Sequence, residues 1–146
     1  MKKLISLLPI ALLVAFAAGC ASPASGPTYS ESKNTLPAPN PGSGRIFIYR
    51  TDILGSISEP PVRVNGDEAG TARVRGFFYV DLAPGRYRID TGSKDENVVR
   101  VNLARGQVVY VRLEFSADPF GINLDPAIVD ADTAQGQIAD CRLTRR

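Results

Sequence analysis

Short runs of alternating apolar residues, separated by turn residues, constrain the fold of this chain more than any other feature of its sequence. The runs are rich in β-branched and aromatic side chains, which favour strands. Asn65-Gly66 lies between two of them and favours the positive φ angles of a type I′ hairpin turn. Pro84-Gly85 fits the central pair of a type II turn. The expected strands cover residues 45–50, 62–64, 69–74, 76–82, 86–91, 99–103 and 109–115.

This spacing of strands and turns predicts an all-β fold. We expect a small antiparallel β-sandwich of about seven to eight strands, of the immunoglobulin or prealbumin kind. The expected domain covers residues 45–146, with a less regular pattern from residue 116 onward. Residues 116–125 are expected to form a loop, residues 127–129 a last edge strand, and residues 133–140 one or two helical turns.

The N-terminus has the features of a secretory leader. Its apolar stretch covers residues 4–17, which is shorter than the ~20 residues of a membrane-spanning helix. Ala18-Gly19-Cys20 follows this stretch and resembles a bacterial lipobox. The resemblance implies a signal peptide over residues 1–19, cleavage between Gly19 and Cys20, and lipidation of the Cys20 thiol, with acyl chains such as palmitate.

The residue after the lipobox bears on the location of the protein. Ala21 stands where an Asp would resemble an inner-membrane retention signal. In a double-membraned bacterium, this implies a lipid-anchored protein on the periplasmic side of the outer membrane.

A compositional break over residues 20–44 follows the leader. Proline disfavours helix at the preceding residue, and the stretch shows no apolar periodicity. It is therefore expected to be an extended, mobile tether that could reach ~80 Å when fully stretched. Tyr29 and Leu36 are isolated in it and suggest no buried contact. The prolines are Pro23, Pro27, Pro37, Pro39 and Pro41.

Charge and composition exclude several classes of function. The sequence has 17 basic and 15 acidic residues, and Lys2 and Lys3 lie in the leader, so the mature chain has 15 of each. Such a balance removes the electrostatic case for nucleic-acid binding. The chain has no histidine, the commonest general base and metal ligand. With Cys20 lipidated, Cys141 is a lone thiol, and an inert thiol is favoured over a catalytic one.

Two groups of side chains form a possible interaction face. Arginines at outward positions of alternating strands could make a basic stripe across one sheet, although a solvated face of mixed charge is the favoured interpretation. Aromatic residues could form an exposed patch, although burial, for instance under the C-terminal segment, is favoured. The arginines are Arg63, Arg86, Arg88, Arg100 and Arg112, and the aromatic residues are Phe47, Tyr49, Phe77 and Tyr79.

No catalytic or metal motif is recognisable. We expect neither a catalytic site nor a cofactor, and a solvated acidic surface is favoured over a metal site for the late carboxylates. These are Asp118, Asp125, Asp130 and Asp132.

Two resemblances rest on the turns and strands. Residues 62–87, with the Asn-Gly and Pro-Gly turns, resemble a PEGA-type β-sandwich module. Residues 44–115, from the run 45–50 to the run 106–111, are similar to a family of small bacterial lipoproteins known as domain of unknown function 2846. That family brings no known catalytic residues.

These features lead to one expected function and to open alternatives. The expected function is a non-enzymatic, membrane-anchored interaction or assembly module of the cell envelope, with an envelope protein or a polysaccharide as partner. The alternatives are a small-ligand binder or hydrolase that uses carboxylate or Arg side chains in a pocket, and an inhibitor that presents a loop over residues 118–125.

Overall fold

A computed structural model describes residues 24–54, 58–92, 97–119 and 121–144. The predicted leader, the lipobox with Gly19 and Cys20, and Ala21 lie outside the described residues. Within the described residues, no helix has the length and apolar character needed to cross a membrane.

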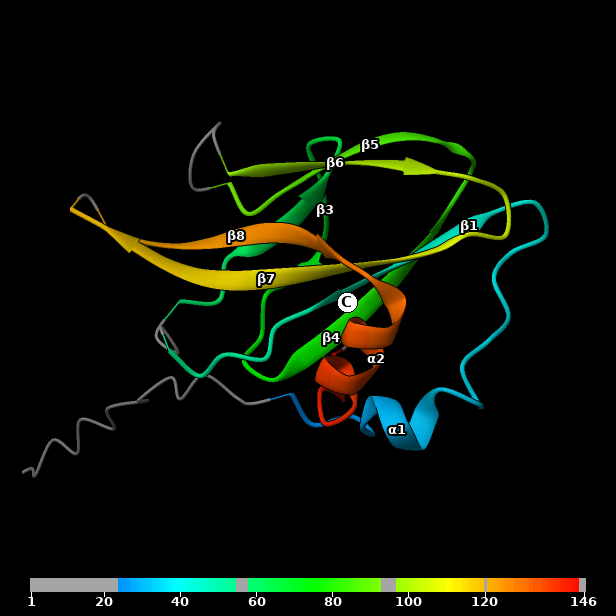
Figure 1. The fold of residues 1–146 in the computed structure, drawn as a ribbon, viewed down its shortest axis with the longest axis horizontal. Coiled ribbons are helices and arrows are strands. Elements are labelled where there is room, and N and C mark those ends of the chain that lie inside the picture. Colours follow the sequence, from blue (N-terminus) through cyan, green and yellow to red (C-terminus); the bar gives the residue numbers. More distant parts are fainter. Residues whose placement is uncertain (1–23, 55–57, 93–96, 120, 145–146) are drawn as a thin grey trace, which may run out of the picture.

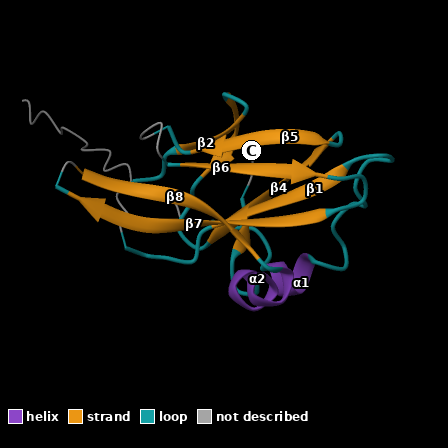
Figure 2. Ribbon diagram, turned by 45° about the horizontal axis from the view of Figure 1, so that its top comes forward, coloured by secondary structure: helices purple, strands orange, loops and turns teal. Residues whose placement is uncertain are grey.

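The described chain folds into two β-sheets packed face to face, with two helices on the outer side of one sheet (Figures 1 and 2). The five-stranded sheet has the order β8-β7-β1-β4-β9, and the four-stranded sheet has the order β3-β2-β5-β6. The all-β sandwich expected from the sequence is therefore confirmed. The strands are β1 Gly44–Tyr49, β2 Pro61–Val64, β3 Asp67–Thr71, β4 Gly76–Leu82, β5 Gly85–Asp90, β6 Val98–Leu103, β7 Val108–Asp118, β8 Gly121–Val129 and β9 Arg142–Leu143, and the helices are α1 Tyr29–Ser32 and α2 Ala131–Ile138.

The core lies on both faces of the five-stranded sheet. Strand side chains alternate between faces, so Ile46 and Ile48 of β1 point between the two sheets, where they belong to the main core. Phe47 and Tyr49 point to the opposite face and pack in a second cluster beneath the helices. This explains why every residue of β1 is buried.

The two predicted turns differ in outcome. Asn65 and Gly66 have φ angles of 52° and 91°, as the hairpin turn between β2 and β3 requires. Gly85 does not have a positive φ angle; it is the first residue of β5 and pairs with Leu103 of β6. The type II prediction is wrong here because the chain passes from β4 in one sheet to β5 in the other at this point.

The confirmed sandwich differs from the expected one in that two of its strand pairs are not antiparallel. β1 pairs with β7 in parallel, and β4 pairs with β9 in parallel. The other named strand pairs are antiparallel. Strand β7 follows β6 of the other sheet in the sequence, and the chain crosses back to pair with β1, so the direction of β7 depends on that crossing and on no local signal.

The predicted tether is wrong over residues 24–36, where Tyr29 is buried and Leu36 packs against the second core cluster, whereas residues 37–43 have no regular secondary structure and are mostly exposed. Helix α1 begins with a capping box, in which the Thr28 hydroxyl accepts from the Glu31 amide and the Glu31 carboxylate accepts from the Thr28 amide. Tyr29 is buried and packs edge-to-face against the rings of Phe47 and Phe77. Tyr29 is a single aromatic residue that packs against strands distant in the sequence. It belongs to no periodic apolar pattern, so the sequence did not indicate that it is buried.

The C-terminal third contains more strand than expected. Residues 116–125 are not a loop: Ser116 pairs with Asn123 and Asp118 with Gly121, so β7 and β8 form one long hairpin. The expected edge strand at residues 127–129 is the end of β8, and the expected helical turns belong to α2, whose N-cap is Asp130.

Candidate interaction surface

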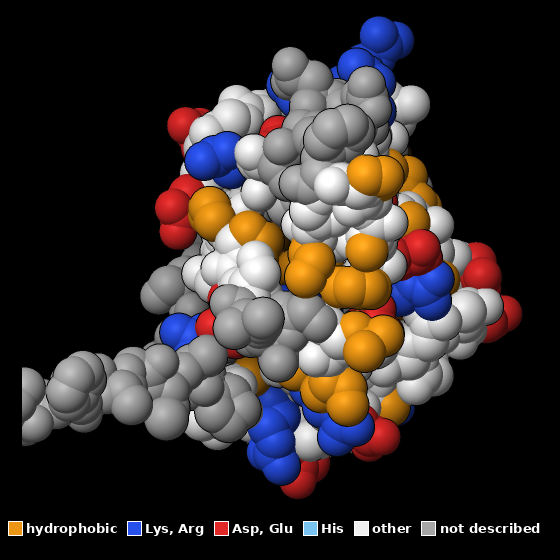
Figure 3. Space-filling view, turned by 90° about the vertical axis from the view of Figure 1, so that its left-hand side faces the viewer, with side chains coloured by type: hydrophobic (Ala, Val, Ile, Leu, Met, Phe, Trp, Pro, Cys, Tyr) orange, Lys and Arg blue, Asp and Glu red, His pale blue; other side chains and the backbone are white. Residues whose placement is uncertain are grey.

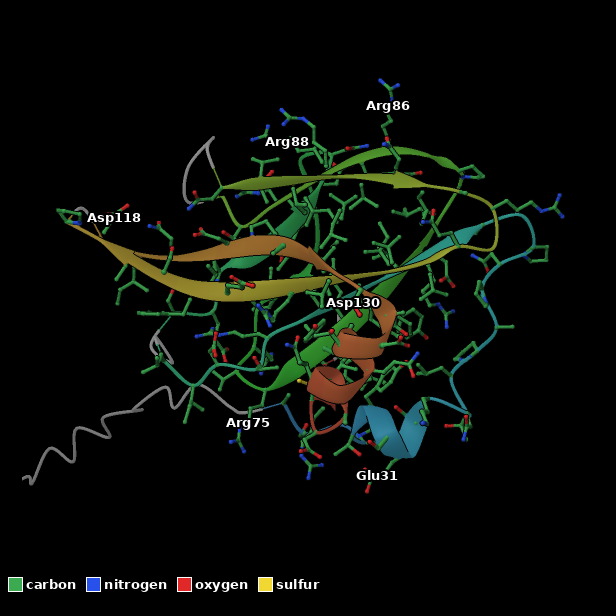
Figure 4. The ribbon with its side chains drawn as sticks, in the orientation of Figure 1. Glu31, Arg75, Arg86, Arg88, Asp118 and Asp130 are labelled. Atoms are coloured by element: carbon green, nitrogen blue, oxygen red, sulfur yellow. The ribbon has the colours of Figure 1, made fainter. Side chains whose placement is uncertain are left out.

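The outer face of the four-stranded sheet carries three neighbouring arginines. Arg86 and Arg88 occupy alternate positions of β5, and both point away from the other sheet (Figure 4). Arg100 of β6 lies directly opposite Arg88 in the strand register, and Asn102 lies opposite Arg86. All three arginines are exposed. We call Arg86, Arg88 and Arg100 the arginine face.

The arginine face surrounds an open depression with a volume of about 470 Å³. The β2–β3 turn forms one wall, because the Arg88 amide donates to Asn65 Oδ1 at 2.8 Å and the Asn65 amide donates to the Arg88 carbonyl at 2.8 Å. The Tyr87 hydroxyl donates to the Ala83 carbonyl at 2.7 Å, and its ring packs against the main core. The lining residues are Asn65, Arg86, Tyr87, Arg88, Arg100 and Asn102.

Charge is distributed unevenly over this face. Asp90 lies at one end, where its carboxylate is 4.0 Å from Arg63 Nη1 and 3.7 Å from Arg88 Nε. Arg86 and Arg100 form no ion pair with any residue in the described part of the chain. Arg86, which lies two positions beyond Arg88 from Asp90, therefore gives its end of the depression the more positive charge.

Arg112 does not belong to this surface. It lies on β7 in the five-stranded sheet, where its guanidinium pairs with Glu114 and its Nε donates to Oε1 at 3.0 Å. The hydrogen bond to Glu114 raises the pKa of Arg112. The five arginines therefore do not form one stripe across a single sheet. The alternation of residues in a strand indicates which side chains share a face of that strand, but it does not indicate which sheet the strand joins.

The four aromatic residues of the predicted interaction face pack under the helices. Phe47, Tyr49 and Phe77 are buried and Tyr79 is half-buried. The Tyr49 hydroxyl donates to Gln137 Oε1 of α2 at 2.7 Å. The favoured interpretation, burial on both faces of these strands, is confirmed, and an exposed aromatic patch is excluded for Phe47, Tyr49 and Phe77.

The residues matched by a known protein family cover most of the sandwich and all of its arginine face. Residues 40–124 match the model of a family described as Protein of unknown function (DUF2846). The chain belongs to this family. No curated protein matches the chain. The match begins before β1 and ends within β8, so both helices and β9 lie outside the matched residues.

This DUF2846 protein has a buried ion pair that the sequence pattern did not reveal. The Arg45 guanidinium donates to both carboxylate oxygens of Asp81, at 2.6 and 2.8 Å. It also lies over the Tyr79 ring, 4.1 Å from the centroid. The hydrogen bond to Asp81 raises the pKa of Arg45. Arg45 and Asp81 lie opposite each other in the antiparallel register of β1 and β4. A correct prediction of that register would have predicted the ion pair.

A second buried arginine follows β1. Arg50 is 1% exposed, and its terminal nitrogens donate to the carbonyls of Leu54, Ser58 and Ala72 at 2.8 to 3.0 Å. Burial lowers the pKa of Arg50. Since its partners are backbone carbonyls of the β1–β2 and β3–β4 connections, we assign it a structural role in holding these two connections together.

The other candidate chemical groups lie apart from one another. Cys141 is 2% exposed, and burial raises the pKa of its thiol to about 11. Asp130 caps α2, Asp125 accepts from the Ser116 hydroxyl, and Asp118 accepts from the Asn123 amide. In the described ranges, no group of three or more Cys, Asp or Glu side chains is placed to hold a metal ion.

Proposed function

We propose that this DUF2846 protein is a cell-envelope lipoprotein, anchored through lipid on Cys20, and that it acts as a non-enzymatic interaction module. Its arginine face binds an acidic polysaccharide. The observation that carries this proposal is the cluster of Arg86, Arg88 and Arg100 around one open depression. The absence of histidine from the sequence and the burial of Cys141 support a binding role over a catalytic one.

The register of the arginine face supports an anionic ligand. Like charges directly opposite each other on neighbouring strands destabilise a sheet, and Arg88 and Arg100 are such a pair. The Asp90 carboxylate offsets part of this repulsion at Arg88, and a bound carboxylate beside Arg100 would offset the rest. Guanidinium groups match carboxylates in bidentate geometry.

The polar neighbours support a saccharide. Asn65 and Asn102 line the same depression and carry amides that can hydrogen-bond to sugar hydroxyls. The volume of about 470 Å³ lies within the usual range of ligand sites.

Calorimetric titration with oligogalacturonate, a chain of carboxylate-bearing sugars, tests the binding role. We expect the variant Arg86→Gln/Arg100→Gln to lose most of the affinity of the wild-type protein. The variant Arg75→Gln/Arg105→Gln removes the same charge from exposed positions outside the depression and is the matched control. Equal affinity of both variants, or no binding by the wild-type protein, would contradict the proposal.

Mass spectrometry of the mature N-terminus tests the anchor. We expect a lipid-modified Cys20 in the wild-type protein and an uncleaved leader in Cys20→Ser. We also expect the wild-type protein to fractionate with the outer membrane of a double-membraned host, and Ala21→Asp to shift it to the inner membrane. An unmodified Cys20 in the wild-type protein would refute the anchor.

A further inference from the structure

A carboxylate of the protein itself stands at one end of the arginine face. Asp90 is the last residue of β5 and lies two positions beyond Arg88, so both side chains are on the same face of the strand. Asp90 is 6% exposed, and its Oδ1 accepts from the Gly92 amide at 3.0 Å. This hydrogen bond fixes the carboxylate at the point where β5 ends.

Two guanidinium groups contact the Asp90 carboxylate. Arg63 of β2 lies opposite Asp90 in the strand register, and its Nη1 is 4.0 Å from Oδ1. Gly92 leaves room for this guanidinium, since an added Cβ would be 2.3 Å from Nη1. Arg88 Nε is 3.7 Å from the other carboxylate oxygen, Oδ2. Asp90 therefore already supplies these two arginines with the kind of partner that an acidic ligand would offer.

The two ends of the face differ in the residues beside their arginines. At the Asp90 end, Glu68 of β3 lies opposite Arg63 in the strand register, so acidic and basic residues alternate across three strands. Figure 3 views the molecule from this end and shows Asp and Glu side chains beside Lys and Arg side chains at its upper left. At the other end, Arg86 lies opposite the neutral Asn102 and forms no ion pair within the described residues.

We propose that Asp90 determines the length of acidic polysaccharide that the arginine face accepts. It excludes ligand carboxylates from Arg63 and confines them to the end of the face at Arg86 and Arg100. This inference rests on the proposed binding role of the arginine face, and it names the part of the ligand that is recognised, a short run of charged sugars.

Two physical effects support this exclusion. Asp90 belongs to the same fold as Arg63 and Arg88, so its effective concentration beside their guanidinium groups exceeds that of a ligand in solution. Its charge is also largely removed from water, and charges of the same sign repel more strongly as the local dielectric constant falls. A chain of uronic acids that continued along β5 past Arg88 would therefore gain no affinity from its additional carboxylates.

Calorimetric titration with two lengths of the same ligand tests this role of Asp90. The measured quantity is the ratio of the affinity for hexagalacturonate to the affinity for trigalacturonate. Asp90→Asn removes the charge and keeps an oxygen that can accept from the Gly92 amide. We expect this variant to raise the ratio about tenfold above the wild-type value, the effect of one added charge-assisted hydrogen bond, because the longer chain then reaches Arg63.

Further variants separate this effect from a general change of charge. Asp67→Asn removes one negative charge from an exposed position of β3 in the same sheet and should leave the ratio at the wild-type value. Arg63→Gln should also leave the ratio unchanged, since Asp90 keeps the ligand away from this residue. In the double variant Arg63→Gln/Asp90→Asn, the gain in the ratio should disappear.

The inference is overturned if Asp90→Asn leaves the ratio at the wild-type value, or if Arg63→Gln alone lowers it. Thermal melts show which variants are folded. If Asp90→Asn does not fold, Arg63→Gln decides by itself, because an unchanged ratio supports the exclusion and a lower ratio contradicts it. Absence of binding of both oligomers by the wild-type protein refutes the proposed function, and this outcome is distinct from binding with an unaltered ratio.

Discussion

The hydroxyl oxygens of Tyr29 and Tyr110 lie 3.1 Å apart and are hydrogen-bonded, although 81 residues separate them in the sequence. Tyr29 belongs to α1 and Tyr110 to β7, so this bond joins the segment before the sandwich to the five-stranded sheet. Burial raises the pKa of Tyr29 above its ordinary value, which keeps its hydroxyl protonated and able to share a proton with Tyr110.

Substitution of Tyr29 tests whether this segment stabilises the domain. Tyr29→Ala should lower the free energy of unfolding by about 3–5 kcal/mol, since it removes a ring that packs on Phe47 and Phe77. Tyr29→Phe keeps the ring and should cost about 1 kcal/mol for the lost hydrogen bond. Urea unfolding measures both values. A chain shortened to begin at Gly44 with the stability of the full chain would show that the segment contributes nothing.

The aromatic cluster beneath the helices predicts unequal effects at Phe77 and Tyr79. Phe77 is fully buried, so Phe77→Ala should leave a cavity and cost about 3–5 kcal/mol. Tyr79 is half-buried and stacks with Arg45, so Tyr79→Ala should cost less. The midpoints of urea unfolding provide the comparison. Unchanged midpoints for both variants would mean that the cluster does not hold the fold together.

Buried acids in the second core cluster predict loss of stability at high pH. Burial raises the pKa of the Cys141 thiol to about 11 and that of the Tyr49 hydroxyl to about 12. In the unfolded chain these groups ionise near ~8.5 and ~10. Above those values the unfolded state releases protons that the folded state retains, so their contribution to stability is complete below about pH 8.5 and declines as the pH rises toward 11 and 12.

Urea unfolding at several pH values from about 8 to about 10.5 measures this decline. Cys141→Ala removes one of the titrating groups and should give a shallower decline than the wild-type protein. An identical pH dependence for the two proteins would rule out the buried thiol as a cause.

A glycine within α2 offers a stabilising substitution. Gly136 has open space around the position of a Cβ atom, with nothing within 4 Å, and its φ angle is not positive. Gly136→Ala should therefore raise the free energy of unfolding by about 0.5–1 kcal/mol, because alanine favours helix and restricts the unfolded chain. A thermal melt measures the gain. A lower Tm for the alanine variant would mean that α2 needs the freedom of glycine.

Local signals in the sequence were sufficient for several elements. The alternation in residues 45–50 and 109–115 indicates strands because side chains on neighbouring positions of a strand point to opposite faces. Asn65-Gly66 indicates the hairpin turn between β2 and β3, because both residues tolerate the positive φ angles that this turn requires. The turns and strands together also identified the family, since its model matches residues 40–124.

The sequence by itself thus determined the strands up to residue 115, the helical turns near residue 136 and the fold class, because each depends on neighbours within a few positions. Only the tertiary structure decided that β7 lies parallel to β1, that Arg112 is separated from Arg86, and that Tyr29 closes the second core cluster. These features depend on contacts between segments that are distant in the sequence. Each of these features depends on how well the faces of the sheets and helices pack against one another. A pattern within one segment of the sequence does not contain this information.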